Sequence, residues 1–307
     1  MTTRRRLIGN LAALGGVAAT GGCRSWFGGP AFPAYGARLS DRLWMWGHDS
    51  GVYDGPKGEY GIPLSPAISM ADACADMGIP NVCVIRWEKA DAAYLAQFRR
   101  MRRVSWVIGS VHRKAYQNLR EHDFDLIGKM PNLVGFDLDD LFLGGAARQV
   151  KTPEGERLVL PTDPTYEQIQ ELSARAKAAA RPMDLRAVLY THQLKPEIAP
   201  LLNYMDTVTF WTWSGVDVAK LEQNFRTYRK FVPKTPTLLG IYMWDFGGRK
   251  PLDMTFMRAQ MDVAEKLFKA GDIEGLVFHC TPLVNKGLEA VNYCRDWIAR
   301  HRDDTRS

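Results

Sequence analysis

The sequence lacks the cysteine patterns of metal sites and lacks a long apolar run after its first residues. Its five cysteines form no CxxC pair, which excludes zinc ribbons and thioredoxin-like redox motifs. The four that follow the N-terminal region are expected to be buried thiols, although an oxidising compartment would permit a Cys280–Cys294 disulfide. No later segment is long and apolar enough for a transmembrane helix. The net charge of +6 is not arranged as a basic stripe with interleaved aromatics, so nucleic acid is not an expected partner.

The N-terminus has the features of an export signal. Arg4, Arg5 and Arg6 are followed by a weakly apolar stretch, residues 7–19, that ends in small residues. This order resembles bacterial twin-arginine signal peptides. Cys23 follows two glycines and resembles a lipoprotein cleavage site, although Thr20 stands where leucine is usual. Lipidation of Cys23 and plain cleavage nearby both stay open.

The resemblance implies a twin-arginine (Tat) signal over residues 1–23 and export to the periplasm, with a membrane anchor only if Cys23 carries a lipid. Residues 24–40, rich in glycine, proline and aromatics, are expected to form a tether or a strap over the base of the domain. The composition of the chain, 46% hydrophobic and 24% charged, is ordinary for a globular protein.

The rest of the chain alternates short apolar runs with helical patterns. Eight runs are almost continuously apolar, as are strands buried on both faces of a parallel sheet; they are residues 43–47, 81–87, 104–109, 133–139, 185–191, 207–213, 237–244 and 275–279. Helical periodicity is clearest at residues 65–77, 164–180, 216–231, 254–270 and 284–301. The alternation predicts a (β/α)₈ TIM barrel over residues 41–302, with a short tail at 303–307.

Two features qualify this fold. An open doubly wound sheet is the alternative, but no GxGxxG follows the first strand, which argues against a dinucleotide-binding version. Residues 148–152 and 157–161 flank Pro153-Glu154-Gly155-Glu156 and predict a β-hairpin inserted after the fourth strand. Loops on that face of a barrel build active sites.

Polar and aromatic residues follow the predicted strands where each strand ends. In a barrel these ends meet at one face, so the following residues are expected to converge there: His48, Asp49, Arg86, Glu88, His112, Asp137, Asp139, Asp140, Tyr190, His192, Trp211, Trp213, Trp244, Asp245 and His279. An isolated member can have a purely structural role, such as a helix cap at Asp140. Burying Asp137 and Asp139 without partners would cost several kcal/mol, roughly, so the whole set indicates a site.

Carboxylates across a mouth that also carries tryptophans suit the cleavage of glycosides. Indole faces stack on the C–H surfaces of sugars, and two acids can cleave an acetal. Strand alternation places Asp137 and Asp139 on one face, and Asp245 approaches from the opposite side. The expected catalytic acids are therefore Asp137, Asp139, Asp140 and Asp245, with the remaining strand-end residues binding the carbohydrate and no cofactor required.

Two segments resemble known glycosidases. Gly135-Phe136-Asp137-Leu138-Asp139 is similar to the fourth-strand segment of family-18 chitinases, and Ile241-Tyr242-Met243-Trp244-Asp245-Phe246 is similar to their later Tyr-Asp-Phe strand. The resemblance implies a glycoside hydrolase of the barrel type. The chain departs from the family at one decisive position, because Leu141 stands where those enzymes have their glutamate acid.

Two other functions fit the same residues. A metal-dependent hydrolase could take zinc or manganese on ligands drawn from His48, Asp49, His112, Asp139, His192 and His279. Against this, there is no HxH on the first strand and no HExxH. A non-catalytic carbohydrate-binding barrel is the other alternative, and Leu141 in the glutamate position favours it.

Overall fold

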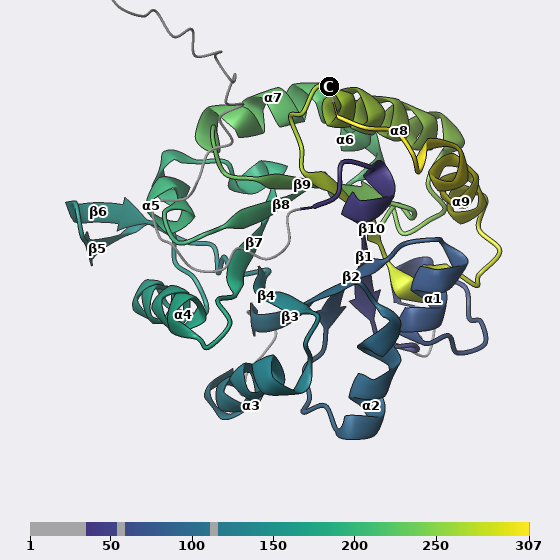
Figure 1. Ribbon diagram of the computed structural model, residues 1–307. Coiled ribbons are helices and arrows are strands. Elements are labelled where there is room, and N and C mark those ends of the chain that lie inside the picture. Colours follow the sequence, from purple (N-terminus) through teal and green to yellow (C-terminus); the bar gives the residue numbers. More distant parts are fainter. Residues whose placement is uncertain (1–34, 54–58, 111–115, 307) are drawn as a thin grey trace, which may run out of the picture.

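The computed structural model describes residues 35–53, 59–110 and 116–306. Within these residues, eight parallel strands close into one barrel in the order β1-β10-β9-β8-β7-β4-β3-β2, with helices around it (Figure 1). The predicted (β/α)₈ barrel is confirmed, and the open sheet is excluded because β1 pairs with both β2 and β10. The signal predicted at residues 1–23, with Cys23, lies outside the described residues, as does most of the predicted tether.

The barrel strands are short and nearly all of their residues are buried. Their bounds are β1 Leu43–His48, β2 Asn81–Ile85, β3 Arg103–Ser110, β4 Leu133–Asp139, β7 Asp184–Tyr190, β8 Thr207–Trp211, β9 Thr237–Tyr242 and β10 Gly275–His279. β4 and β10 have the predicted bounds. β2, β8 and β9 end two residues before their predicted ends at 87, 213 and 244, so Trp87, Trp213 and Trp244 lie in loops rather than in strands.

Helices and short 3-10 turns connect the strands on the outside of the barrel. The helices are α1 Met70–Asp76, α2 Ala92–Ala96, α3 Tyr116–Lys129, α4 Tyr166–Ala178, α5 Ala199–Leu202, α6 Gly215–Val218, α7 Leu221–Phe231, α8 Met254–Lys269 and α9 Glu289–His301. The 3-10 turns are η1 Leu39–Arg42, η2 Glu59–Gly61, η3 Gln97–Arg100, η4 Thr191–Gln193, η5 Pro196–Ile198 and η6 Thr281–Leu283. No helix in the described ranges has the length and apolarity needed to span a bilayer.

Local capping explains where the observed helices differ from the predicted ones. α1 begins at Met70 rather than at residue 65 because the Ser69 hydroxyl accepts a hydrogen bond from the Asp72 amide at 3.0 Å. The helix predicted at 216–231 is two helices, α6 and α7, separated by Ala219 and Lys220. α9 begins at Glu289, two residues after Gly287, whose φ is +68°. α2 and α3 had no clear signal in the sequence.

The insertion after β4 is a two-stranded hairpin, as predicted. β5 (Arg148–Thr152) pairs antiparallel with β6 (Gly155–Val159), and the hairpin projects from the barrel beside α5 (Figure 1). Its base is closed by two backbone hydrogen bonds, from the Leu143 amide to the Pro161 carbonyl at 3.0 Å and from the Asp163 amide to the Leu141 carbonyl at 2.9 Å. The hairpin is therefore fixed to the segment that directly follows Asp139 and Asp140.

The four cysteines of the barrel are buried free thiols. They are Cys74, Cys83, Cys280 and Cys294. The prediction of buried thiols is confirmed, and Cys280 and Cys294 do not form the disulfide that an oxidising compartment would permit. The stability of the barrel therefore depends on packing rather than on covalent links.

Close packing between neighbouring strands sets the floor of the barrel mouth. Gly240 of β9 lies directly against the indole of Trp211, and a Cβ at this position would overlap that ring. Trp211 is 1% exposed and packs edge-on against Trp46 of β1, with ring centroids 5.6 Å apart. Glycine at 240 is thus what allows Trp211 to lie across the barrel axis.

We expect Gly240→Ala to lower the free energy of unfolding by about 1–3 kcal/mol, because the added methyl group must displace Trp211 in a filled core. Urea unfolding followed by tryptophan fluorescence measures the change. Gly128→Ala is the matched control, since Gly128 lies in α3 with nothing within 4 Å of an added Cβ. The control is expected to be neutral or stabilising by up to about 1 kcal/mol. Equal stability of the two variants would contradict the packing argument.

Candidate functional site

Two adjacent carboxyl groups lie at the C-terminal end of β4. Asp139 is the last residue of the strand and is 7% exposed, and Asp140 follows with a φ of +44°. Burial raises the pKa of Asp139 well above its usual value, and the charges of Asp140 and Asp137 raise it further. A left-handed backbone at a residue other than glycine is uncommon and is concentrated at functional sites. The pair therefore places a carboxyl with a raised pKa beside a second carboxyl group.

Two tyrosines from the ends of β7 and β9 interact with this pair. Tyr190 ends β7 and Tyr242 ends β9. Burial raises the pKa of Tyr190 well above its usual value, and Tyr242, Asp140 and Asp139 add to the shift, as does a hydrogen bond to Asp140. Burial, then Asp140 and Asp139, likewise raise the pKa of Tyr242. Both phenols thus stay neutral and can donate hydrogen bonds at the mouth of the barrel.

Tryptophan and phenylalanine rings line the space around the acids. Trp213 is 38% exposed, and its ring centroid lies 6.2 Å from that of Tyr190 and 6.1 Å from that of Tyr242. Phe246 is 5.9 Å from Trp213 and 4.6 Å from His279. Trp211 lies below, 5.0 Å from Tyr242. The partly exposed indole of Trp213 beside these rings offers an apolar face on which a sugar ring can stack.

Two histidines complete the mouth on the side of β1 and β10. The ring centroids of His48 and His279 are 5.9 Å apart, and the Thr281 hydroxyl donates to the His48 carbonyl at 2.7 Å. Burial lowers the pKa of His48 to about 4. Burial, together with the neighbouring His48, lowers the pKa of His279 well below its usual value. Both rings are therefore neutral at physiological pH.

Unsatisfied polar atoms gather at the same ends of the strands. Four buried atoms there have no hydrogen-bond partner among the described residues, and they are His48 Nδ1, Thr191 Oγ1, Thr212 Oγ1 and His279 Nδ1. Buried polar groups of this kind are rare unless a ligand or an ordered water completes them. We name the residues at this end of the barrel the mouth cluster. It comprises Asp139, Asp140, Tyr190, Trp211, Trp213, Tyr242, His48 and His279.

The remaining predicted acids lie elsewhere. Asp137 is 2% exposed and sits deeper in the barrel, where burial raises its pKa and the charge of Arg186 opposes the shift. Asp245 Oδ1 accepts hydrogen bonds from the Gly215 amide at 3.1 Å and the Gly248 amide at 2.7 Å. The Asp245 side chain thus fixes the loop after β9 to the start of α6. Trp244 is 1% exposed and donates its indole N–H to the Tyr60 carbonyl at 3.0 Å.

The predicted polar residues of β1 and β2 form a separate ion pair. Arg86 contacts Asp49 at 2.7 Å and the largely exposed Glu88 at 3.4 Å, while its guanidinium lies 3.9 Å from the ring centroid of Tyr94. The Tyr94 hydroxyl donates to the other Asp49 oxygen at 2.7 Å. Asp49 is therefore already paired.

His192, which follows β7, is exposed and stacks on Tyr190, with ring centroids 5.6 Å apart and ring planes 17° apart.

Some members of the site had no signal in the sequence, and one predicted member cannot be placed. His112 lies outside the described residues. Tyr53 and Tyr60 reach Phe246 from the long loop after β1, with centroid distances of 5.7 Å and 5.4 Å. Nothing in that loop marks it as part of a site. Tyr242 could have been found, because it stands two residues after Gly240 on the inward face of β9.

The described residues contain one compact group of potential metal ligands, and it is not at the mouth. Glu265, His301 and Asp304 have ligand atoms within 4.8 Å of one another. Lys269 binds both carboxylates, at 2.5 Å and 3.2 Å, and so occupies the position that a cation would take. Among the described residues of the mouth, no three potential ligand atoms lie that close together.

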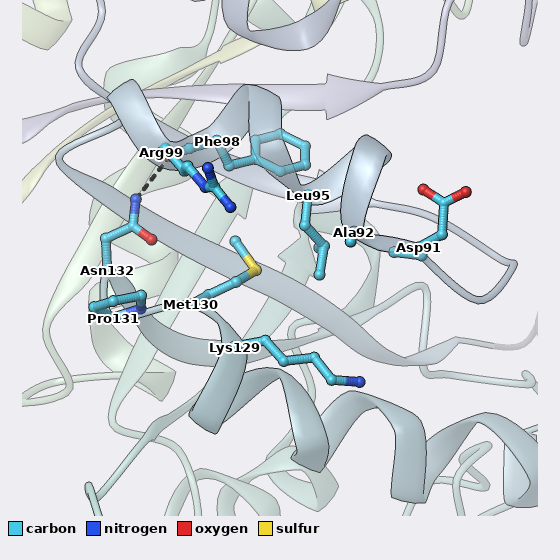
Figure 2. Close-up of a pocket in the computed structure, with 10 residues that line it drawn as sticks. Asp91, Ala92, Leu95, Phe98, Arg99, Lys129, Met130, Pro131 and Asn132 are labelled. Atoms are coloured by element: carbon cyan, nitrogen blue, oxygen red, sulfur yellow. Dashed lines mark hydrogen bonds between the residues drawn. The ribbon is translucent and has the colours of Figure 1, made fainter.

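A separate pocket lies on the outer wall of the barrel. It measures about 640 Å³ and lies between the α2–η3 segment and the end of α3 (Figure 2). Its lining is mainly apolar, with Leu95, Phe98 and Met130. Its carboxylate, Asp91, is used as the N-cap of α2, since Oδ1 accepts from the Tyr94 amide at 2.8 Å. This pocket lacks the paired acids that hydrolysis of a glycoside requires.

Comparison with known proteins supports the barrel fold. No family model and no curated sequence matches the chain. Among solved structures, it resembles a candidate alpha-L-fucosidase from Bacteroides thetaiotaomicron, with a TM-score of 0.53 and 9% identity over 90% of this chain and 99% of that one. It also resembles the catalytic domain of a chitinase from Pyrococcus furiosus, with a TM-score of 0.51 and 11% identity over 85% of this chain and 96% of that one. Both similar structures are glycoside hydrolases by name, and at such identity the likeness establishes the fold alone.

The neutral His48 makes stability depend on pH. Its pKa is about 4 in the folded protein against 6.5 for an ordinary histidine, so the unfolded chain binds more protons between these values. The free energy of unfolding is therefore expected to fall as the pH falls from about 6.5 towards about 4.

The test compares the wild type with His48→Gln by denaturant unfolding across this pH range. The difference between the two reports His48 together with its smaller effect on the pKa of His279, because the raised pKa of Asp139 acts in the opposite direction in both proteins. We expect a shallower fall for His48→Gln. The same slope in both would show that His48 titrates normally in the folded state.

Proposed function

We propose that the protein is a glycoside hydrolase that cleaves its substrate at the mouth cluster. The observation that carries the proposal is the Asp139–Asp140 pair, in which one carboxyl is buried at the end of β4 and has a raised pKa. Tyr190 and Tyr242 interact with this pair and also pack against the exposed Trp213. Glycoside hydrolysis needs a carboxylic acid that is still protonated near neutral pH and a second carboxyl group close by. The similar structures are consistent with this chemistry because they share the barrel.

The chemistry assigns a step to each acid. Asp139 donates its proton to the glycosidic oxygen while the bond between that oxygen and the anomeric carbon breaks, so the electron pair leaves with the departing sugar. Asp140 stabilises the positive charge that develops at the anomeric carbon. Water then forms a bond to that carbon through its oxygen and gives one proton to the ionised Asp139, which restores the acid. Leu141 is 1% exposed and apolar. The role that glutamate has at this position in family-18 chitinases therefore falls to Asp139 in this chain.

Trp213, Tyr190 and Tyr242 bind the sugar in this proposal. Trp213 stacks on a ring face, and the two phenols hydrogen-bond its hydroxyl groups. The substrate is a carbohydrate, and no cofactor takes part in the steps described. A barrel that binds carbohydrate without cleaving it is the second candidate, and the observation that favours it is the apolar residue at position 141.

We expect Asp139→Asn to lower kcat by about 10²–10⁴-fold, the usual contribution of a general acid. Aryl glycosides and polysaccharides are screened first to find a substrate. For the wild type, kcat/KM should fall as the pH rises through the raised pKa of Asp139, because the acid is then ionised. Asp91→Asn is the matched control, since Asp91 only caps α2, and it should leave activity unchanged.

Three outcomes separate the candidates. Full activity of Asp139→Asn would refute the assignment of the acid. Sugar binding without turnover in the wild type, weakened by Trp213→Ala, would establish the carbohydrate-binding barrel instead. Inactivation by a chelator, with metal in the purified protein, would establish the metal-dependent alternative.

The N-terminal residues carry a separate proposal, that the protein is exported through the twin-arginine route and anchored by a lipid on Cys23. The proposal is supported by Arg4, Arg5 and Arg6 ahead of the apolar stretch and by the small residues before Cys23. A single anchor would hold the barrel near a membrane in the periplasm.

We expect Cys23→Ala to move the protein from the membrane fraction to the soluble periplasmic fraction, because the lipid attachment atom is lost. Immunoblots of fractionated cells measure the distribution. An unchanged membrane fraction would eliminate the lipid anchor and leave export alone.

A further inference from the structure

A second concave surface lies beside the mouth cluster. It is a groove of about 670 Å³ between the hairpin strand β6 on one side and the η5–α5 segment on the other. The residues that line it are Glu154, Arg157, Leu158, Pro196, Glu197, Ala199, Pro200 and Asn203. None of them belongs to the mouth cluster, and the hydrolysis proposed above does not use them.

The two walls of the groove are extensions of the strands that carry the acids and Tyr190. β4 and β7 are neighbours in the barrel. The hairpin follows β4 and is joined to it where the Asp163 amide bonds the Leu141 carbonyl. On the other wall, Pro196 follows the exposed His192 by four residues, a distance of at most about 14 Å in an extended chain. Both walls of the groove therefore belong to loops that follow two adjacent strands at the rim that carries the mouth cluster.

The side chains in the groove suit a neutral ligand rich in hydroxyl groups. Glu197 Oε2 is buried and has no hydrogen-bond partner among the described residues, so this oxygen would gain from a hydroxyl donor. The Arg157 guanidinium makes a long hydrogen bond to the Glu154 carbonyl, at 3.5 Å, and can donate to a ligand oxygen. The groove carries two carboxylates, of Glu154 and Glu197, and one guanidinium, of Arg157. This excess of negative charge disfavours a strongly anionic ligand.

The groove also offers apolar surface for the C–H faces of sugar rings. Leu158 is 48% exposed on β6, and Pro196 and Pro200 stand opposite it. An exposed leucine beside hydrogen-bonding groups is the mixed lining that small-ligand sites present. His192, stacked on Tyr190, provides a ring face between the groove and the mouth.

We infer that this groove is a second saccharide-binding site, which holds units of a polymeric substrate several sugars away from the bond cleaved at the mouth cluster. The inference rests on the proposed function and makes it more specific: the natural substrate is a chain rather than a small glycoside. Tyr190 and His192 link the two sites, so one chain can occupy both.

The test separates binding in the groove from chemistry at the mouth. Calorimetry measures the affinity of the hexamer and the dimer of N-acetylglucosamine, and of glucose oligomers of the same lengths, for Asp139→Asn protein, which cannot turn them over. The groove variant carries Glu197→Ala and Arg157→Ala in that background. The matched control is Glu156→Ala, on the same strand but outside the groove lining.

We expect the hexamer to bind at least about tenfold more weakly to the groove variant, which is the effect of losing one or two hydrogen bonds to charged groups. Dimer affinity and the control should not change. Cleavage of aryl glycosides by the otherwise wild-type groove variant should also persist.

Each result decides one of the two claims. Equal hexamer affinity in all variants, or no preference for hexamer over dimer, would overturn the groove site and leave the proposed hydrolase intact. If the groove variant binds the hexamer more weakly but the wild type cleaves no glycoside, the proposed hydrolase would be overturned and the groove site would stand. Failure of every oligomer to bind would overturn the groove site for these sugars, while cleavage of aryl glycosides would still test the mouth.

Discussion

The pairing of β1 with β10 is the constraint on which the mouth cluster depends. This pair joins the first and last strands of the barrel, with Trp46 opposite His279 in the register. Because all eight strands are parallel, closure brings their C-terminal ends to one rim. His48 and His279, more than two hundred residues apart in sequence, then have ring centroids 5.9 Å apart. Without closure, β1 and β10 would be the two edges of an open sheet, and His48 and His279 would lie far apart.

A charged layer below the mouth influences its electrostatics. Asp137 and Arg186 are each 2% exposed, and the Arg186 guanidinium lies 4.6 Å from the ring centroid of Trp44. Burial disfavours the charge of Arg186, but Tyr35, Asp184 and Asp137 outweigh it and raise its pKa, so it stays charged. Asp137 in turn contributes to the raised pKa of Asp139, after burial and Asp140. Asp137 therefore affects both the buried charge of Arg186 inside the barrel and the pKa of Asp139 at its rim, and both aspartates lie on β4.

The sequence was sufficient for the barrel and for part of the site. β4 was predicted to the residue, because a continuous apolar run that ends in aspartates at alternate positions is typical of a buried strand with a polar end. Trp213 and Trp244 were wrongly placed in strands, because aromatic residues extend the apolar pattern beyond the last ladder hydrogen bond. The roles of Asp245 and Asp49 depend on Gly215, Gly248, Arg86 and Tyr94. Such partners are brought by tertiary contacts, so no local pattern reveals them.

The raised pKa of Asp139 has a cost in stability. A carboxyl whose pKa is raised on folding lowers the free energy of unfolding at neutral pH, because the unfolded chain can ionise freely and the folded protein cannot. The left-handed backbone of Asp140 adds a further cost. General acid catalysis needs a carboxyl with a raised pKa, so the destabilising feature is the one that the proposed reaction uses.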